Sequence, residues 1–366
     1  MNKTVYDFAI VGAGMAGASL AAELADDARV LVLEAEDQPG YHTTGRSAAF
    51  WEECYGGPEI VPLTLASGKM LRDGGFLSPR GALYVARRED TAKIDRFIER
   101  FSGTGVTIER LGRDALAERV TGLKAAWCDA VWEPACADID VAGLHAHYLS
   151  RARKGGIELA MRARLSGVRR AGDEWRLRTE DGREFTAKVL VNAAGAWADP
   201  VARLAGAKPL NIIPLLRTVA QVVVDPPVPA DQPLVLDISG QFYFKPDNGR
   251  IWLSPHDETP TIAHDAAPDE MAVAEAIDRF QRVVDCKIER VERKWAGLRS
   301  FAPDRAPVYG FDDTIDGFAW FAGQGGYGIQ TAPAAAVLMA DTLLGRETSQ
   351  AVRQIDRNLY LPSRFA

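Results

Sequence analysis

The sequence predicts an α/β fold in which a Rossmann-like, dinucleotide-binding domain is interrupted by an inserted α+β domain with a mostly antiparallel sheet. Three features predict it: an N-terminal strand–glycine turn–helix unit, two later apolar strands that run into small-residue turns, and short strands with hairpin signals between them. At 366 residues the chain exceeds the usual size of a single core. We expect the nucleotide-binding domain at residues 1–78, 139–210 and 296–366, and the inserted domain at residues 79–138 and 211–295.

The N-terminal segment has the order and spacing of a dinucleotide-binding unit. Tyr6–Val11 (YDFAIV) is a short run that is apolar and aromatic apart from Asp7, typical of a buried parallel strand. It leads into G-x-G-x-x-G at Gly12, Gly14 and Gly17, whose glycines permit a tight turn, close approach of a pyrophosphate and close packing of the next helix. A second strand ends in Glu34, where a carboxylate can accept hydrogen bonds from an adenosine ribose. An acid at this point disfavours NADP and leaves NAD and FAD open.

Two later strands that are expected to join the same sheet favour FAD over NAD. Lys188–Ala198 and Phe318–Gly328 are apolar strands that break into small-residue turns. A helix is expected over 329–345, closed by Gly345. A helix N-terminus at this turn suits a flavin pyrimidine, because the reduced ring carries negative charge near N1 and the C2 carbonyl.

The segment Gly40–Ala49 (GYHTTGRSAA) leaves the second strand just past Glu34, so we expect it to run along the cofactor toward the flavin. Its hydroxyl groups and glycines permit close contact with a ligand. Arg46 can either face the phosphates or buttress the loop.

The inserted domain is predicted from strands and one helix. Strands are expected at Gly81–Arg87, Arg217–Val224, Gln241–Lys245 and Arg250–Leu253. The sequence PDNGR indicates a hairpin turn before the last of them, and residues 269–286 are expected to form a helix.

Several motifs together resemble the D-amino-acid oxidase (DAO) superfamily: VGAGMAGAS, LEAE, QPGYHTTGRSAA, VLVNAAGAWA, FYFKPD, WAGLRSF and GQGGYGIQT. They occur in the same order from Tyr6 to about Leu344 and look most like bacterial D-amino-acid dehydrogenases of the D-arginine dehydrogenase type. The resemblance implies a DAO/glutathione-reductase-like fold and FAD, which we expect to be non-covalent because no Cys lies near Arg299. It also implies cofactor contacts from Gly12, Gly14, Ala16, Gly17, Glu34, Ala35, Thr43, Thr44, Arg46, Ser47, Ala48, Ala49, Val168, Gly195, Gly325, Gly328, Ile329 and Gln330.

Polar residues in apolar surroundings indicate the substrate site. Arg217 and Arg299 lie in apolar segments, and a buried guanidinium needs an anion, either a substrate carboxylate or a structural Asp or Glu. By resemblance, Arg217, Tyr243 and Arg299 hold the substrate carboxylate. Tyr55 corresponds to a tyrosine of the active-site lid, and Gly326 to a backbone carbonyl that accepts from the substrate amine.

The part of the site that would receive the substrate side chain is predicted from a difference between this sequence and its D-arginine-preferring relative. The D-arginine-preferring relative has a glutamate on the first strand of the substrate domain, where this sequence has Ala82. Phe50 and Trp51 add apolar surface, which favours a neutral or apolar side chain. Glu52 and Glu53 could supply a replacement carboxylate.

The expected reaction is FAD-dependent oxidative deamination of a D-amino acid to the 2-oxo acid and ammonia, by hydride transfer from Cα to flavin N5. Oxygen or a quinone would reoxidise the flavin. Alternatives are oxidation of a secondary amine or glycine-type substrate, oxidation of a 2-hydroxy acid, and a flavin-binding structural subunit. No side chain stands out as a general base, so we expect the rate to rise with pH as the amine loses its proton.

Composition excludes several other classes. A net charge of −7 argues against a nucleic-acid partner, and no apolar run approaches the length of a membrane span. The four cysteines form no C-x-x-C pair, which is typical of a cytoplasmic protein. No metal site is expected, because His145 and His147 would face different sides of a helix, and His256 and His264 lie in a loop.

Overall fold

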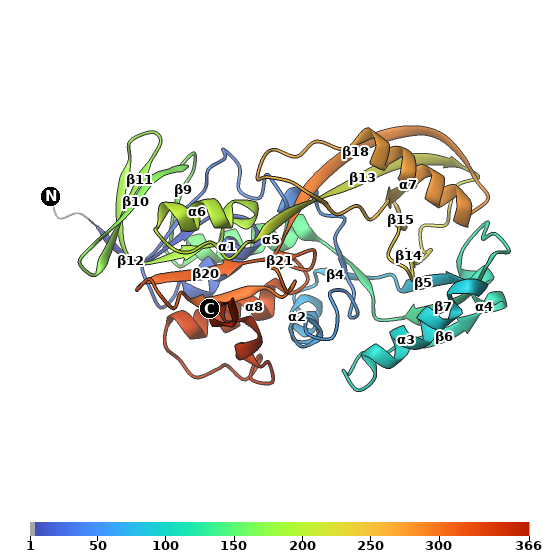
Figure 1. Ribbon diagram of the computed structural model, residues 1–366, viewed down its shortest axis with the longest axis horizontal. Coiled ribbons are helices and arrows are strands. Elements are labelled where there is room, and N and C mark those ends of the chain that lie inside the picture. Colours follow the sequence, from blue (N-terminus) through green and yellow to red (C-terminus); the bar gives the residue numbers. More distant parts are fainter. Residues whose placement is uncertain (1–3, 366) are drawn as a thin grey trace.

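A computed structural model describes residues 4–365 and has two main sheets at opposite ends of an elongated molecule (Figure 1). The first sheet contains the nucleotide-binding unit. β1 (Val5–Val11) lies between β2 (Val30–Leu33) and β12 (Glu184–Asn192), and both pairs are parallel. β9 (Glu158–Ala160) and β20 (Phe318–Ala322) extend the parallel part outward. The carboxyl ends of β1, β2 and β12 therefore meet at one edge, where open α/β sheets bind ligands.

Helices rich in small residues cover one face of this sheet. α1 (Met15–Leu24) packs against α5 (Val141–Lys154) and α8 (Ala332–Leu343), and α8 contacts α2 (Val61–Asp73). α6 (Ala198–Leu204) contributes to the core on the other face. Within residues 4–365, no helix combines the length and apolar character needed to cross a lipid bilayer.

The last helix begins later than expected. α8 starts at Ala332, not at residue 329, and Pro333 lies in its first turn. Proline has no N–H to donate and fits only the beginning of a helix, which fixes the start near this residue. Gly345 has φ of +63° just beyond the last turn, so the expected glycine end is confirmed.

The second sheet is mostly antiparallel, as predicted. Its longest strands, β13 (Ile213–Asp225) and β18 (Lys287–Phe301), pair along their whole length. β15 (Tyr243–Asp247) and β16 (Arg250–Ser254) form the expected hairpin. Asn248 and Gly249 both have positive φ in its turn, which is the geometry that Asn-Gly favours.

The remaining strands complete this sheet and a small third one. β14 (Leu234–Asp237) pairs in parallel with β5 (Ala82–Arg87), and the neighbouring pairs are antiparallel. The other strands are β6 (Glu109–Gly112), β7 (Trp127–Glu133), β17 (Thr259–Pro260) and β21 (Gln324–Gly325) in the second sheet, β10 (Leu165–Ala171), β11 (Glu174–Thr179) and β19 (Val308–Phe311) in the first, and β3 (Phe50–Trp51), β4 (Leu77–Pro79) and β8 (Ala137–Ile139) in the third.

Helices cover the second sheet at its outer end (Figure 1). These are α3 (Thr91–Phe101), α4 (Arg113–Arg119) and α7 (Glu270–Val283). The Asp269 carboxylate accepts from the N–H of Ala272 and so caps α7. α7 stops at Val283, earlier than expected, because Val284 is extended and forms a β-bridge with Leu123.

Candidate active site

A cavity of about 390 Å³ opens at the carboxyl ends of β1, β2 and β12 and reaches the β13–β18 pair. Its size lies in the usual range for small-molecule sites. The glycine turn after β1 lies at one end. Arg217 of β13 and Arg299 of β18 lie at the other, so one cavity joins the two ends of the predicted site.

The glycine turn has the close packing that its motif predicts. Gly12 has φ of +101°, and a Cβ there would lie 2.7 Å from the carbonyl oxygen of Ala193. A Cβ on Gly17 would lie 1.9 Å from the Gly12 oxygen, which brings α1 directly against the turn. Gly14 lines the cavity without a side chain, and this leaves room for a phosphate at the start of α1.

Glu34 ties this turn to the end of β2. Its Oε2 accepts from the N–H of Ala13 at 2.8 Å, and its Oε1 accepts from the N–H of Glu36 at 3.0 Å. The nearly buried carboxylate also lines the cavity, so its remaining lone pairs can accept from ribose hydroxyls. His145, which the sequence analysis left without a role, contacts the Ala13 oxygen through Nε2 at 2.9 Å and supports the same turn.

The hydroxyl-rich segment contacts both α1 and β18. Thr44 Oγ1 accepts from the N–H of Met15 at 2.9 Å, in the first turn of α1. Thr43 Oγ1 donates to the carbonyl of Leu298 in β18 at 2.7 Å. The segment therefore bridges the nucleotide-binding helix and the substrate sheet while lining the cavity.

Arg46 buttresses the loop instead of facing only the cofactor. Its guanidinium donates to the carbonyl of Ala266 at 2.8 Å and pairs with the carboxylate of Asp265. Trp295 donates through Nε1 to the Arg46 carbonyl at 3.0 Å. The charge of Arg46 is thus largely used in holding the loop to the second sheet.

Most residues expected at the cofactor line this cavity. They are Gly12, Gly14, Ala16, Glu34, Ala35, Thr43, Thr44, Arg46, Ser47, Ala48, Ala49, Gly195, Gly325, Gly328, Ile329 and Gln330.

Two residues expected at the cofactor lie elsewhere. Gly17 does not line the cavity and acts through helix packing. Val168 lies in the middle of β10, away from the cavity, whose wall is formed by residues 163–165 at the start of that strand. The N–H of Ala163 donates to the Glu34 carbonyl at 2.7 Å, which draws this end of the strand, and not Val168, to the cofactor edge.

At the other end, polar groups converge on Arg299. Its Nη1 donates to the Tyr55 hydroxyl at 3.1 Å, and its Nη2 donates to Glu258 Oε1 at 2.7 Å. A Cβ on Gly326 would lie 2.0 Å from the Tyr55 hydroxyl and 3.0 Å from Arg299 Nη1, so only glycine fits there. Arg299 Nε is buried and has no hydrogen-bond partner among the described residues.

Arg217 lies beside it. Its Nε donates to the carbonyl of Asp257 at 2.9 Å, and Nη2 lies 3.7 Å from Glu258 Oε1. Burial and the neighbouring charge of Arg299 lower the pKa of Arg217 to about 10. The two guanidinium groups therefore raise the positive potential of this end of the cavity, as an anion site requires.

Glu258, which sequence reasoning did not place at the site, contacts both arginines. Burial alone would raise its pKa, but hydrogen bonds and charges from Arg305 and Arg299 outweigh that effect and hold the pKa at about 2. Arg305 Nη2 lies 2.8 Å from Oε1. The only signal in the sequence was an acid in a loop rich in proline and histidine, which does not reveal its partners.

Aromatic rings surround the guanidinium pair. Phe50 lies 5.7 Å from Tyr243 and 6.0 Å from Tyr55, centroid to centroid. Leu236 and His256 also line this end of the cavity, and His256 was not expected there. Burial first, then the charges of the two arginines, lower the pKa of His256 to about 3.

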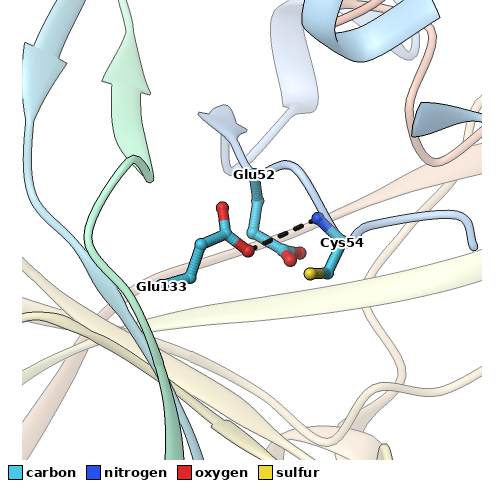
Figure 2. A group of neighbouring side chains, drawn as sticks. All are labelled: Glu52, Cys54 and Glu133. Carbon is cyan, nitrogen blue, oxygen red and sulfur yellow. Dashed lines mark hydrogen bonds between the residues drawn. The ribbon is translucent and has the colours of Figure 1, made fainter. Parts of the chain in front are cut away.

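Glu52 and Ala82 do not line the cavity, in contrast to the expectation that they face the substrate side chain. Ala82 is fully buried in β5, within a core cluster. Glu52 is also fully buried and points toward Glu133 and Cys54 (Figure 2). The reason is local: β3 ends at Trp51, so the alternation that puts Phe50 on the cavity does not continue to Glu52.

The buried acids form their own cluster. Glu52 Oε1 accepts from the Tyr84 hydroxyl at 2.5 Å, and Glu133 accepts from the N–H groups of Glu53 at 2.7 Å and Cys54 at 3.4 Å. Burial, and then the charge of Glu133, raise the pKa of Glu52 well above its usual value. The ligand atoms of Glu52, Cys54 and Glu133 lie within 4.8 Å of one another, so the set can share a proton or hold a metal ion.

Comparison with known proteins identifies the chain's relatives. It is 29% identical over 203 residues to hydrogen cyanide synthase subunit HcnC of Pseudomonas aeruginosa, covering 55% of this chain and 47% of that protein. It is 27% identical over 227 residues to L-2-hydroxyglutarate dehydrogenase of Escherichia coli, covering 57% and 52%. The chain thus spans about half the length of these curated relatives. Its identity to glycine oxidase of Geobacillus kaustophilus is 26% over 363 residues, 94% of each chain.

Solved structures show the same fold. L-proline dehydrogenase from P.horikoshii superposes with a TM-score of 0.86 at 22% identity, over 99% of this chain and 98% of that one. The family described as FAD dependent oxidoreductase (DAO) matches residues 7–342. The glycine turn, the Glu34 carboxylate and the segment from Gly40 provide the cradle that FAD needs. The chain belongs to the DAO family of FAD-dependent oxidoreductases.

Proposed function

We propose that the protein oxidises D-amino acids with a neutral or apolar side chain to the 2-oxo acid and ammonia. The observation that carries the proposal is the pair of buried guanidinium groups, Arg217 and Arg299, at the end of the FAD cavity. In this proposal, residues 1–78, 139–210 and 296–366 hold FAD. Residues 79–138 and 211–295 form the substrate domain.

The substrate carboxylate would be held at the arginine pair. Arg299 lines the cavity, and its guanidinium can donate charge-assisted hydrogen bonds to a carboxylate there. The hydroxyls of Tyr55 and Tyr243 would complete the contacts, and the carbonyl of Gly326 would accept from the amine. These roles follow the family resemblance and agree with the convergence of Tyr55, Arg299 and Gly326 at one point.

FAD, when bound, supplies an acceptor for the substrate hydride at N5. The chain's own contribution would be to fix the carboxylate and amine so that the Cα–H bond points in one direction, which is catalysis by positioning. The acids that line the cavity, Glu34 and Glu36, lie at the nucleotide end. The amine would therefore bind without its extra proton, and kcat/KM would rise with pH until the free amino acid is deprotonated.

The lining of the substrate end supports a neutral side chain. Phe50, Leu236 and Tyr243 are apolar or aromatic, and no carboxylate of the described residues lines the cavity beside them. A cationic side chain would lack a counter-ion and would be repelled by the two arginines. The D configuration rests on the resemblance to dehydrogenases of the D-arginine type.

A second candidate is oxidation of glycine, a secondary amine or a 2-hydroxy acid. The glycine oxidase that aligns over 94% of this chain favours glycine, and the L-2-hydroxyglutarate dehydrogenase favours a 2-hydroxy acid. The arginine pair would bind any 2-substituted acid. Oxygen or a quinone as electron acceptor, non-covalent FAD and a cytoplasmic location also belong to the proposal.

Product analysis tests the function. The purified holoenzyme is incubated with single neutral D-amino acids and their L-enantiomers, and 2-oxo acid and ammonia are quantified together. Equal amounts of both products from the D-enantiomer only would support the proposal. Product from sarcosine or 2-hydroxy acids, with none from D-amino acids, would contradict it. Arg299→Met, which should bind substrate much more weakly, serves as the control and should give little product at the same substrate concentration.

A further inference from the structure

The imidazole of His256 lies in the wall of the substrate cavity, in the loop that follows β16. Its ring packs edge-on against the ring of Tyr243, with 5.9 Å between centroids and 85° between planes. Leu236 and Phe50 line the same end. The proposed function assigns the two arginines and the hydroxyls of Tyr55 and Tyr243 to the substrate carboxylate, which leaves His256 as a polar, uncharged side chain of this wall without an assigned role.

One tautomer of His256 is fixed by its partner. Nδ1 lies 2.7 Å from the carbonyl oxygen of Gly240, which can only accept. Nδ1 therefore carries the hydrogen, and Nε2 presents a lone pair. Nε2 has no hydrogen-bond partner among the described residues. The charged groups that face the ring are Arg217, Arg299 and Glu258, and the two arginines disfavour protonation.

The backbone holds the ring in place. His256 has φ of +60°, a conformation that residues with a side chain rarely adopt. Its N–H donates to Ser254 Oγ at 3.2 Å, and its carbonyl accepts from Arg217 Nη2 at 3.4 Å. Such backbone strain gathers at functional sites, where the surrounding structure imposes it. His256 thus contacts Arg217 through its backbone carbonyl and also places a hydrogen-bond acceptor, Nε2, near the two arginines.

We propose that His256 Nε2 accepts a hydrogen bond from the substrate side chain, and that the enzyme prefers side chains with a neutral donor, a hydroxyl or an amide N–H. The inference rests on the proposed function, in which the carboxylate and amine have other partners. An ammonium or guanidinium side chain would gain the acceptor but meet the charges of Arg217 and Arg299. A neutral donor gains the acceptor without that repulsion.

The test compares near-isosteric substrates in matched variants. His256→Asn keeps an N–H for the Gly240 carbonyl but lacks Nε2. His264→Asn changes a histidine of the same loop that contacts its own neighbour, the Ile262 carbonyl at 2.8 Å, and is the control. The kcat/KM values of wild type and both variants are measured for D-asparagine against D-leucine and for D-serine against D-2-aminobutyrate.

We expect His256→Asn to lower kcat/KM about tenfold for the donor member of each pair and less than twofold for the apolar member, as loss of one hydrogen bond predicts. His264→Asn should change neither. An equal loss for both members would make the ring a structural or amine contact and would overturn the inference, as would no loss at all. If the wild type oxidised neither member, the proposed function itself would fail, and the inference with it.

Nitrogen NMR gives an independent reading of the same group. In protein with ¹⁵N-labelled histidine, the signals lost in His256→Asn identify the ring. We expect a neutral ring protonated on Nδ1 from pH 5 to 9, and an Nε2 shift that moves when D-asparagine binds anaerobically to protein whose flavin is already reduced, but not with D-leucine. A ring protonated near pH 6, or one protonated on Nε2, would overturn the assignment.

Discussion

Arg299 donates from Nη2 to the carboxylate of Glu258 at 2.7 Å, while its Nη1 donates to the hydroxyl of Tyr55 at 3.1 Å. The same carboxylate binds Arg305 at 2.8 Å and lies 3.7 Å from Arg217. One acid therefore orients three cations and offsets part of their charge. Glu258 does not itself line the cavity, so the donors that face the cavity remain available for a substrate anion.

Glu258→Gln should tighten substrate binding. The amide keeps an oxygen that can accept from Arg299, but removes a negative charge near the arginine pair. Repulsion between the partly exposed Glu258 carboxylate and a substrate carboxylate at the arginine pair should cost about 1 kcal/mol of binding free energy. Without it, KM should fall about fivefold. Steady-state kinetics with a neutral D-amino acid measure the change.

Glu292→Gln is the matched control for this variant. Glu292 pairs with Arg250 at 2.5 Å on the surface of the second sheet, far from the cavity lining. The substitution removes the same charge and should leave KM unchanged. A rise in KM for Glu258→Gln, or an equal fall for both variants, would show that Glu258 does not modulate the anion site.

Arg299→Met should raise KM about 100-fold, because a buried charge-assisted contact to the carboxylate is lost. Flavin content should stay at the wild-type level, since Arg299 lies at the substrate end. Arg299→Lys should be intermediate, because an ammonium keeps the charge but not the fork of donors. A KM within threefold of wild type for the methionine variant would remove Arg299 from the site.

Glu34→Ala should weaken FAD binding about 100-fold, because the carboxylate proposed to accept from the ribose hydroxyls is removed and the N–H of Ala13 loses its acceptor. Titration of apoprotein with FAD, followed by flavin fluorescence, measures the dissociation constant. FMN has no adenosine, so its weaker affinity should change much less. An equal loss for FAD and FMN would indicate damage to the fold and not loss of a ribose contact.

Glu52 should make stability depend on pH. Burial, and then Glu133, raise its pKa well above its value in the unfolded chain, near 4.5. Above that pH the unfolded chain releases a proton that the folded chain keeps, so the stability contributed at this site falls as pH rises. The Glu52→Gln variant has no carboxyl group that titrates at this position, so it lacks this pH dependence. The melting temperature of the variant relative to wild type should therefore increase from pH 5 to pH 8.

Two observations would contradict the prediction that Glu52 is protonated beside Glu133. One is a constant difference in melting temperature across the pH range, with Glu89→Gln on the surface as the control. The other is a stoichiometric divalent metal that leaves with Glu52→Gln, measured by elemental analysis of the purified protein. We expect no metal, because the raised pKa of Glu52 favours its protonated form, which carries no charge for a cation and can donate to Glu133.

The nucleotide-binding part of the site could be predicted from the sequence because its residues lie close together along the chain. Gly12, Gly14 and Glu34 lie on one strand–turn–helix–strand unit, so their relation depends on few residues. The fold class followed from the same pattern and is confirmed. Arg217 and Arg299 were found because an arginine in an apolar strand is unusual, and pairing of β13 with β18 brings them together.

Other parts of the site depend on loop paths and strand ends that periodicity does not encode. His256, Glu258 and Arg305 lie in loops and meet only through tertiary packing. Ala82 was placed by an ungapped alignment, and Glu52 was expected at the substrate only as an acid that could replace the missing carboxylate, whereas β3 ends at Trp51 and Glu52 is buried. A shift of one residue in a strand reverses its faces, so such positions are the least predictable.

The most direct test of the proposed function is the anaerobic reduction of the bound flavin. The yellow protein is mixed without oxygen with neutral D-amino acids, their L-enantiomers, sarcosine and 2-hydroxy acids, and the bleaching of the flavin band is followed. The proposal predicts fast bleaching by neutral D-amino acids and slow or no bleaching by the rest. Fast bleaching by sarcosine, glycine or a 2-hydroxy acid, with none by D-amino acids, would contradict it.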